Sequence, residues 1–358
     1  MQFFSKSEYF DELNRRVQLA GSGSQILLMS MSFDPSEQRI AEVMTNLEQA
    51  AARGASVTFG VDAYSFLIDE NQAGPLFLHT SMPAELGAPF SQKLAWLDKL
   101  NQYPNSRAII LNKPQRKYSL WIAGRSHIKA AVIDDYSLIG GANLDEPDLL
   151  DMMAGVQNQG FADELYGTLG KFIETKVAGD VTQQSDQTIA IDTNSRILID
   201  AGVRNKSIIY DAGLRLIDAA QDWLVITCQY FPNARTAQHL LQAKERNVNV
   251  EILYSPPEKH GLVGGLGQQA SVLLERTRLP ANMFDNQLSA ELPKLHAKLI
   301  ACEQGMITGS HNFVEAGVKL GTAEIAIQID NGDLARIAAG KIKSIIASQS
   351  RLHSESNS

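Results

Sequence analysis

Cysteine is almost absent from this chain. Only two of its 358 residues are cysteine, Cys228 and Cys302, and each lies in an apolar run. This usage does not suggest a disulfide framework or a cysteine-rich metal site, so we expect two small, buried hydrophobic side chains.

Long hydrophobic runs are also missing. No stretch approaches the roughly 18 apolar residues that span a bilayer as a helix. The N-terminal residues MQFFSKSEYFDELNRR lack the apolar segment of a secretory signal. We therefore expect a cytoplasmic protein whose contact with a membrane, if it makes any, is peripheral.

The sequence has too few basic residues to balance its acidic ones. It contains 32 lysine and arginine residues against 40 aspartate and glutamate, a net charge of −8. The surface as a whole should repel both nucleic acid and anionic membranes, although a local basic patch can still attract either partner. Residues 107–125 are rich in basic side chains, and we expect them either to steer an anionic substrate or to form a solvated loop.

What the chain does contain is an internal repeat. Two apolar runs of strand length, 25–33 and 222–230, are each followed by a helical pattern, 40–53 and 236–246. A second apolar run then follows in each half, 57–61 and 250–254. The order strand, helix, strand predicts a right-handed βαβ unit in each half, and so an α/β protein with parallel strands.

The repeat also suggests domain boundaries. We expect one repeat over 1–177, a polar linker over 178–194, a second repeat over 195–347 and a frayed tail over 348–358. The first repeat carries an insertion, 66–114, in which 94–100 is expected to form an amphipathic helix. The alternative is a lid or lipid contact made by Phe77, Trp96 and Tyr103. The glycine-rich run 261–267 is expected to be a flexible loop, or alternatively a membrane-touching tip.

A second repeated pattern lies later in each half. His127 and His296 are each followed by lysine two positions on, glycine thirteen on and asparagine sixteen on. For each histidine, three such matches by chance have a probability of about 10⁻³ at average composition. We therefore treat the two strings as copies of one motif.

Each motif is typical of a β-hairpin. Residues 128–133 form the expected first strand, 134–136 the turn and 137–139 the return strand; in the second copy, 303–305 form the turn. Side chains two apart on a strand share a face, so His127 and Lys129 should point the same way, as should His296 and Lys298. Four other histidines, His79, His239, His260 and His353, have no such motif around them.

Two histidines, two lysines and two asparagines suit chemistry at a phosphodiester. Lysine and asparagine can hold the non-bridging oxygens and stabilise the pentacoordinate transition state. One neutral histidine can attack phosphorus while the other, protonated, donates to the leaving oxygen. A covalent phosphohistidine then passes its group to water or to an alcohol. No metal or other cofactor is needed for this scheme, and no metal-ligand spacing is evident.

The pattern His-x-Lys-x4-Asp followed by Gly-Gly/Ser-x-Asn, present twice, resembles the phospholipase D superfamily. Its layout is most similar to bacterial cardiolipin synthases and related phosphatidyltransferases, with which the runs 229–233 and 51–57 are also similar. The resemblance implies two pseudo-symmetric α/β/α sandwich repeats with the active site in the cleft between them. It further implies a monomer that is an internal pseudo-dimer.

The resemblance also implies roles for individual residues. His127 would be the nucleophile and His296 the general acid, Glu324 would orient His296, and Asp151 is the nearest acid for the first copy. Phosphate would be held by Lys129, Lys298, Asn143 and Asn312, substrate would be contacted by Gly141, Ser310 and His311, and the motif acids Asp134 and Glu303 would be structural. The sequence departs from the family pattern at Glu303, where aspartate is usual, and at Gly141, where serine is common.

The function expected from these residues is that of a phosphatidyltransferase or phospholipase acting on glycerophospholipids. One alternative is a nucleic-acid phosphodiesterase of the same superfamily, which the acidic balance disfavours. Another is a catalytically silent, phosphate-binding scaffold, which two intact motifs disfavour. Bacterial cardiolipin synthases begin with membrane spans that this chain lacks, so the resemblance does not define the head group of the lipid substrate.

Overall fold

The chain folds around two mixed β-sheets. The computed structural model describes residues 1–67, 88–112, 123–145, 149–178, 185–256 and 261–356. The first sheet consists of β1 (Gln2–Ser5), β2 (Gln25–Ser30), β3 (Ser56–Asp62), β4 (Ser106–Leu111), β5 (Ala130–Ile133), β6 (Tyr136–Gly140) and β7 (Met152–Gln157). The second consists of β8 (Gln187–Ala190), β9 (Ser195–Asp200), β10 (Trp223–Cys228), β11 (Asn249–Tyr254), β12 (Leu299–Cys302), β13 (Gly305–Gly309) and β14 (Glu324–Ile329).

The two sheets have the same strand order. In the first the order is β4-β3-β2-β5-β6-β7-β1, and in the second it is β11-β10-β12-β13-β14-β9-β8. The run from β3 to β1 thus matches the run from β11 to β9, while β4 and β8 each extend one edge. β2 pairs with β3 in parallel, as β10 does with β11, and both central hairpins are antiparallel. The predicted βαβ units are confirmed, within sheets that are mixed.

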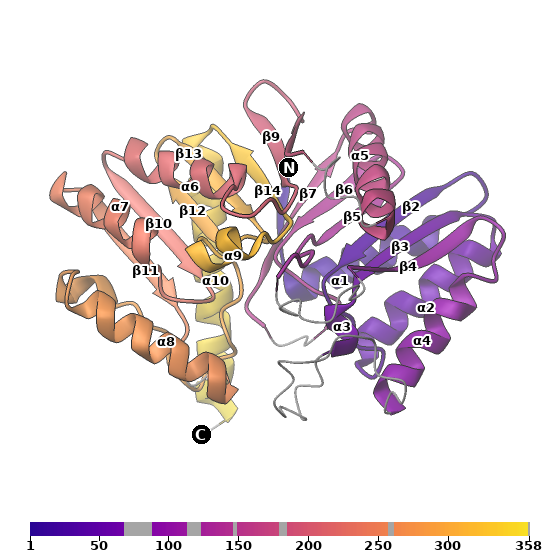
Figure 1. Cartoon of the computed structure of the whole chain (residues 1–358), viewed down its shortest axis with the longest axis horizontal. Helices are drawn as coiled ribbons and strands as arrows, with labels where there is room; N and C mark the ends of the chain where they lie inside the picture. Colours follow the sequence, from indigo (N-terminus) through magenta and orange to yellow (C-terminus); the bar gives the residue numbers. More distant parts are fainter. Residues whose placement is uncertain (68–87, 113–122, 146–148, 179–184, 257–260, 357–358) are drawn as a thin grey trace.

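Helices cover both outer faces of the molecule (Figure 1). The first half contains α1 (Lys6–Leu19), α2 (Gln38–Ala52), α3 (Tyr64–Leu67), α4 (Ala88–Leu100) and α5 (Gln159–Ala178). The second contains α6 (Ile208–Ala219), α7 (Ala234–Glu245), α8 (Gly261–Arg276), the 3₁₀ turn η3 (Ala281–Phe284), α9 (Glu315–Leu320) and α10 (Gly332–Ser356). α1, α2 and α4 pack on one sheet, and α6 and α7 on the other, each through its own apolar core.

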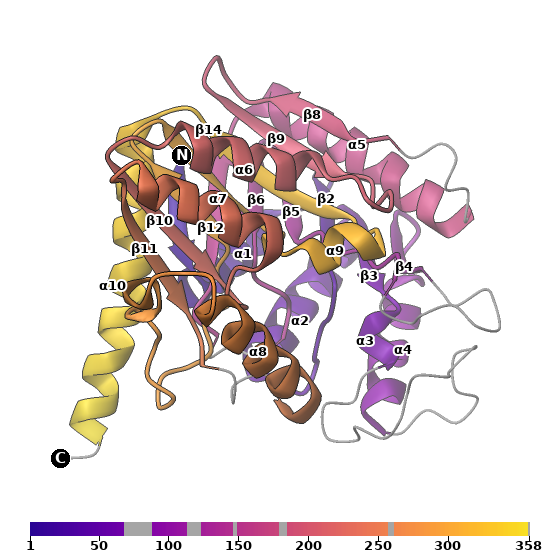
Figure 2. The same cartoon turned by 60° about the vertical axis from the view of Figure 1, so that its left-hand side comes forward.

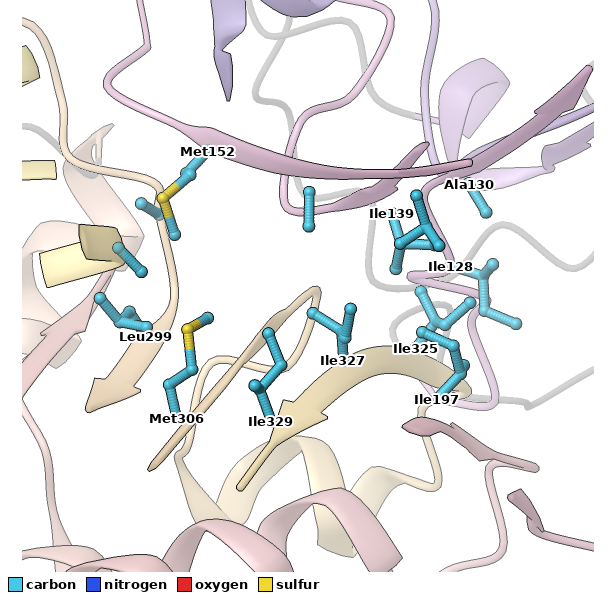
Figure 3. Close-up of a cluster of buried hydrophobic side chains, with 14 of the residues drawn as sticks. Ile128, Ala130, Ile139, Met152, Ile197, Leu299, Met306, Ile325, Ile327 and Ile329 are labelled. Carbon is cyan, nitrogen blue, oxygen red and sulfur yellow. The ribbon is translucent and has the colours of Figure 1, made fainter. Parts of the chain in front are cut away.

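A third apolar core joins the two halves. It is built from the inner faces of both sheets together with α5 and α10. Figure 3 shows Ile139 and Met152 of the first half opposite Ile325, Ile327 and Met306 of the second. Burial of a side chain of this size contributes about 1.5–3 kcal/mol. The two repeats therefore form one continuous structure, with the layers that the α/β/α prediction requires.

Local sequence explains where several elements begin. Ser5 caps α1, its hydroxyl accepting the Glu8 N–H while the Glu8 carboxylate accepts the Ser5 N–H. This reciprocal capping box satisfies two donors that a helix start otherwise leaves open. β2 is apolar and buried on both faces, as expected of a central strand covered by helices on one side and the second half on the other.

The insertion 66–114 contains two elements that complete the first half. α4 includes the predicted helix 94–100, and its Trp96 is buried against Phe33 and Phe59, with ring centroids 6.0 and 5.1 Å away. Trp96 therefore packs on the body of the domain. β4 adds a parallel strand beside β3. Phe77 lies outside the described residues.

Three predictions of local structure were wrong. Residues 261–267, expected to be a loop, lie in α8. The expected linker contains β8, which pairs with β9, and α10 continues through the expected frayed tail to Ser356. Figures 1 and 2 show α10 as one long helix ending at the C-terminus. Cys228 and Cys302 are buried free thiols, as predicted.

Candidate functional site

The two motif hairpins are held by the same device. The motif acid Asp134 stands at the turn after β5 and accepts the backbone N–H of Gln25 at 2.9 Å. Glu303, at the equivalent turn, accepts the N–H groups of Gln221, Asp222 and Trp223 at 2.7, 3.3 and 3.2 Å. Each acid thus ties its hairpin to the start of the neighbouring strand, β2 or β10. The longer glutamate reaches three donors, where Asp134 reaches one.

The two motifs meet across the boundary between the halves. Ser126, just before His127, forms a parallel bridge with Ala323, and Leu295, just before His296, forms one with Leu150. The N–H of His127 donates to the Ala323 carbonyl at 2.8 Å, and that of His296 donates to the Leu150 carbonyl at 2.8 Å. The backbone around each histidine is therefore fixed by the opposite half.

These bridges pair each histidine with an acid from the other half. Ala323 precedes Glu324, whose Oε1 lies 3.1 Å from His127 Nδ1. Leu150 precedes Asp151, whose Oδ2 lies 2.5 Å from His296 Nδ1. The expectation that Glu324 orients His296, and that Asp151 serves the first copy, is wrong. Pairing follows the bridges between halves and not the order of the motifs along the chain.

Asp151 and Glu324 are structural equivalents despite their different distances from the motif asparagines. Asp151 immediately precedes β7, and Glu324 is the first residue of β14. Two residues after each acid, the strand pairs with the hairpin beside it: Met153 pairs with Gly140, and Ala326 pairs with Gly309. Asp151 lies eight residues after Asn143 and Glu324 twelve after Asn312, so counting from the motif did not align them. The start of the apolar strand that follows each motif was the sequence signal that could have aligned the two acids.

The electrostatics of the pairs favour ionised carboxylates. Burial alone would raise the pKa of Asp151, but His296 and Lys298 hold it well below its ordinary value. Glu324 is similar, with His127 lowering its pKa against the effect of burial. Burial, reinforced by Lys298, lowers the pKa of His296 to about 3. A neutral His296 can then donate its Nδ1–H to Asp151 and leave the Nε2 lone pair available.

Both motif lysines are buried beside these pairs. Lys129 Nζ donates to the His127 carbonyl at 2.9 Å, and burial lowers its pKa. Lys298 is 1% exposed, and its Nζ has no hydrogen-bond partner among the described residues. Burial, with Lys129 nearby, lowers the pKa of Lys298 to about 7. A buried ammonium without a hydrogen bond is costly, and an anion placed against it would relieve that cost.

The motif asparagines also carry unsatisfied groups. The side-chain oxygens of Asn143 and Asn312 are buried and, within the described part of the chain, accept no hydrogen bond. Native proteins leave few buried polar atoms without a partner, so such atoms indicate a place where a ligand or water completes the bonding. Lys298 and the two asparagines are thus motif residues whose buried polar atoms lack a partner among the described residues.

The remaining predicted contacts lie close to the acids. The Ser310 hydroxyl donates to Glu324, so it supports the acid that orients His127. A Cβ added at Gly141 would lie 2.3 Å from Asp151 Oδ1, so a serine here would displace that carboxylate. His311 is buried beside Tyr210 and Phe313, and its Nδ1 accepts the Phe313 N–H at 2.9 Å. Substrate contact by these three residues stays a prediction.

The described residues contain no group of three or more His, Cys, Asp or Glu side chains arranged to hold a metal ion. Over the same part of the chain, no helix combines the length and apolarity needed to cross a bilayer.

Comparison with known proteins relates the second half of this chain to a known family. Residues 214–346 match the family described as cardiolipin synthase, PLD-like domain. These residues thus form a phospholipase D-like domain, which supports the resemblance to the phospholipase D superfamily carried by the two motifs. No protein among those with curated descriptions matches this sequence significantly.

Solved structures extend the likeness in fold to the whole chain. Phosphatidylserine synthase from Haemophilus influenzae Rd KW20 matches with a TM-score of 0.71 at 15% identity, covering 97% of this chain and 86% of its own. Polyphosphate kinase from Porphyromonas gingivalis matches with a TM-score of 0.58 at 12% identity, over 96% of this chain and 50% of the kinase. The predicted two-lobed fold of this phospholipase D-like protein is confirmed.

Proposed function

We propose that this phospholipase D-like protein is a phosphatidyltransferase or phospholipase acting on glycerophospholipids through a phosphohistidine. The observation that carries the proposal is the meeting of two histidine–carboxylate pairs beside two buried lysines, one of which has no hydrogen-bond partner among the described residues. Such a site can bind an anionic diester, stabilise charge on its non-bridging oxygens and supply both a nucleophile and an acid.

The proposed reaction has two balanced steps. Nε2 of one histidine attacks phosphorus, the bond from phosphorus to the leaving alcohol oxygen breaks, and the second histidine gives that oxygen a proton. Water or an acceptor alcohol then attacks the phosphohistidine, losing its proton to the second histidine as the N–P bond breaks. Lys129, Lys298, Asn143 and Asn312 hold the non-bridging oxygens throughout, and the scheme uses no metal or other cofactor.

The asymmetry of the two pairs favours an order opposite to that expected from the resemblance. The side chain of His296 is 11% exposed and that of His127 is 24% exposed. A neutral, buried His296 bonded to Asp151 has the lone pair that attack on phosphorus requires. We therefore propose His296 as the nucleophile and His127 as the general acid.

A trapping experiment tests this order. A phosphodiester labelled at phosphorus and carrying a good leaving group is mixed with His127→Ala and His296→Ala, and protein-bound label is measured after quenching. His127→Ala should retain label, because a good leaving group needs little help from an acid, whereas His296→Ala should bind none. The reverse pattern would identify His127 as the nucleophile.

A lipid substrate is supported by the cardiolipin synthase-like family match. The net charge of −8 disfavours the nucleic-acid alternative. Phosphatidylglycerol vesicles with and without glycerol or ethanol should yield cardiolipin or phosphatidylethanol if the enzyme transfers, and phosphatidic acid alone if it hydrolyses. Both alanine variants should be inactive. Turnover of single-stranded DNA or RNA, with none of lipid, would instead establish the nuclease alternative. Absence of any turnover, with anion binding retained, would favour the scaffold.

We further propose that the protein meets the bilayer peripherally through α8. Leu273 and Leu274 on this helix are 68% and 50% exposed. α8 follows β11, and Ser255 at the end of β11 accepts the N–H of Leu295, next to His296.

Replacing both leucines with aspartate should abolish vesicle binding. Ile337→Asp, at an equally apolar position 58% exposed on α10, is the matched control and should bind normally. Unchanged vesicle binding by the double variant would show that this surface of α8 is not the membrane contact.

A further inference from the structure

The segment that leads into His127 is anchored by a buried carboxylate outside the motif. Asp62, at the end of β3, is 0% exposed. Its Oδ1 accepts from Arg125 Nη1 at 3.0 Å and from the Tyr64 N–H at 2.8 Å. Its Oδ2 accepts from the Ser126 N–H at 2.7 Å and from Asn112 Nδ2 at 2.6 Å. Both oxygens are thus fully engaged, and two of the four donors belong to the residues just before His127.

The same two residues make the bridge to the second half. The Arg125 carbonyl accepts the Ala323 N–H at 2.9 Å, and Ser126 is the bridge partner of Ala323. Asp62 therefore holds one side of this short segment while the backbone before Glu324 holds the other. Displacement of residues 125–126 would move His127 relative to Glu324, the acid on its Nδ1.

In the second half, a neutral side chain holds the equivalent segment before the motif histidine. Strand register makes Ser255 the equivalent of Asp62, because Gln25 pairs with Ser56 as Trp223 pairs with Asn249. The Ser255 hydroxyl accepts the N–H of Leu295, just before His296, at 2.7 Å. A serine is thus sufficient to hold the backbone there. The first half instead buries an ion pair, which costs desolvation that a purely structural contact does not need.

We propose that Asp62 is the positioning residue of His127, acting through Arg125 and the Ser126 backbone to hold the ring against Glu324. Arg125, expected to lie in a basic loop or to steer substrate, is 6% exposed and serves as the partner of this carboxylate. The inference rests on the proposed function in treating His127 as a reacting group. The geometric claim does not depend on the substrate.

The test compares equivalent positions in the two halves. Asp62→Ser installs the residue that the second half uses, and Ser255→Ala removes the corresponding acceptor there. Nitrogen-15 NMR of the histidine rings in the full-length protein reads each ring separately. Asp62→Ser should change the His127 ring signals and leave those of His296 in place, whereas Ser255→Ala should do the reverse. Equal changes at both rings, or none at His127, would overturn the proposal.

Kinetics supply the second measurement. A misplacement of a reacting group by about 1 Å can cost ~10²-fold in rate. Asp62→Ser should therefore lower kcat by about 10- to 100-fold with KM nearly unchanged; a raised KM at unchanged kcat would mean a substrate-binding role and would overturn positioning. If Asp62→Ser fails to fold, the neutral pair Asp62→Asn with Arg125→Gln should show the same His127-specific NMR change. Should the wild type turn over no phosphodiester, the NMR comparison still decides the positioning claim, while the proposed function alone fails.

Discussion

At the scale of single residues, Lys298 shows a conflict between stability and binding. Its buried ammonium lacks a hydrogen-bond partner in the described part of the chain, and its lowered pKa reflects that burial. Methionine keeps most of the side-chain volume without the charge. Lys298→Met should therefore not lower the free energy of unfolding in the absence of anion, although it removes the cation that a phosphoryl group would contact.

The same variant should lose stabilisation by a phosphate mimic. Tungstate at about 100 times its Kd should stabilise the wild type by about 2.7 kcal/mol, and Lys298→Met by little or nothing, measured by thermal unfolding. Lys319→Met, which removes a lysine 66% exposed on α9, is the control and should respond like the wild type. The wild-type response should weaken as pH rises above about 7, because the ammonium is lost there. A full response from Lys298→Met would contradict the assigned contact.

Asp200 offers a prediction about pH. It lies directly across from Glu324 in the sheet, and its carboxylate accepts the Gly202 N–H at 3.1 Å. Burial raises the pKa of Asp200 to about 7, with Asp186 and Glu324 adding repulsion. Between about pH 4 and pH 7 the unfolded chain releases this proton and the folded chain keeps it. Stability should therefore fall as pH rises through this range, by up to ~1.4 kcal/mol per pH unit.

Asp200→Asn should remove that dependence. The amide oxygen can still accept the Gly202 N–H, so the variant and the wild type should have similar stability near pH 4. By pH 8 the variant should be more stable by about 1 kcal/mol or more, measured by urea unfolding at both pH values. A variant that is less stable at pH 8 would show that the Asp200 charge is compensated by a group other than those named.

At the scale of elements, we expect the motif acids Asp134 and Glu303 to act on hairpin stability and not on chemistry. Glu303 accepts three backbone N–H groups and Asp134 one. A typical net contribution is about 1 kcal/mol per hydrogen bond. Glu303→Ala should therefore destabilise the protein by about 3 kcal/mol and Asp134→Ala by about 1 kcal/mol in urea unfolding. Both should retain kcat when folded; a selective loss of kcat would assign these acids to the reaction.

Most of the strands and helices around the site could be predicted, because apolar spacing and a repeated order are local properties. The helix over 261–267 could not, since its four glycines carry an intrinsic cost in a helix. What anchors this helix is tertiary: Val272 is buried, and Glu275 accepts the N–H of Ala234 at the start of α7. The β8 strand was missed for a similar reason, since a four-residue edge strand has little pattern of its own.

At the scale of the whole molecule, the site exists only between the halves. The motif residues could be found in the sequence because His, Lys and Asn recur at identical spacing. Their partners could not, because the pairing of His127 with Glu324 and of His296 with Asp151 depends on how two sheets meet over a shared core. The same is true of Asp62, which lies far from the motif in sequence and reaches it through the end of β3.

The crossed pairing makes a prediction that no arrangement within one half would make. Glu324→Gln removes the acid from His127, and Asp151→Asn removes it from His296, with little change in volume. In the labelled phosphodiester experiment, Glu324→Gln should therefore behave as a weaker form of His127→Ala and retain protein-bound label. Asp151→Asn should behave as a weaker form of His296→Ala, with slow or little labelling. Loss of an orienting carboxylate should cost about 10²- to 10⁴-fold in kcat.

The two variants are each other's controls, because both remove one buried carboxylate from a histidine. If each acid served the histidine of its own half, the two labelling patterns would be exchanged relative to the histidine variants. If the acids were only structural, both variants would retain as much bound label per folded molecule as the wild type. Agreement of each acid with the histidine of the opposite half would show that neither repeat completes its own catalytic pair, and that the union of the two halves is a requirement of the chemistry.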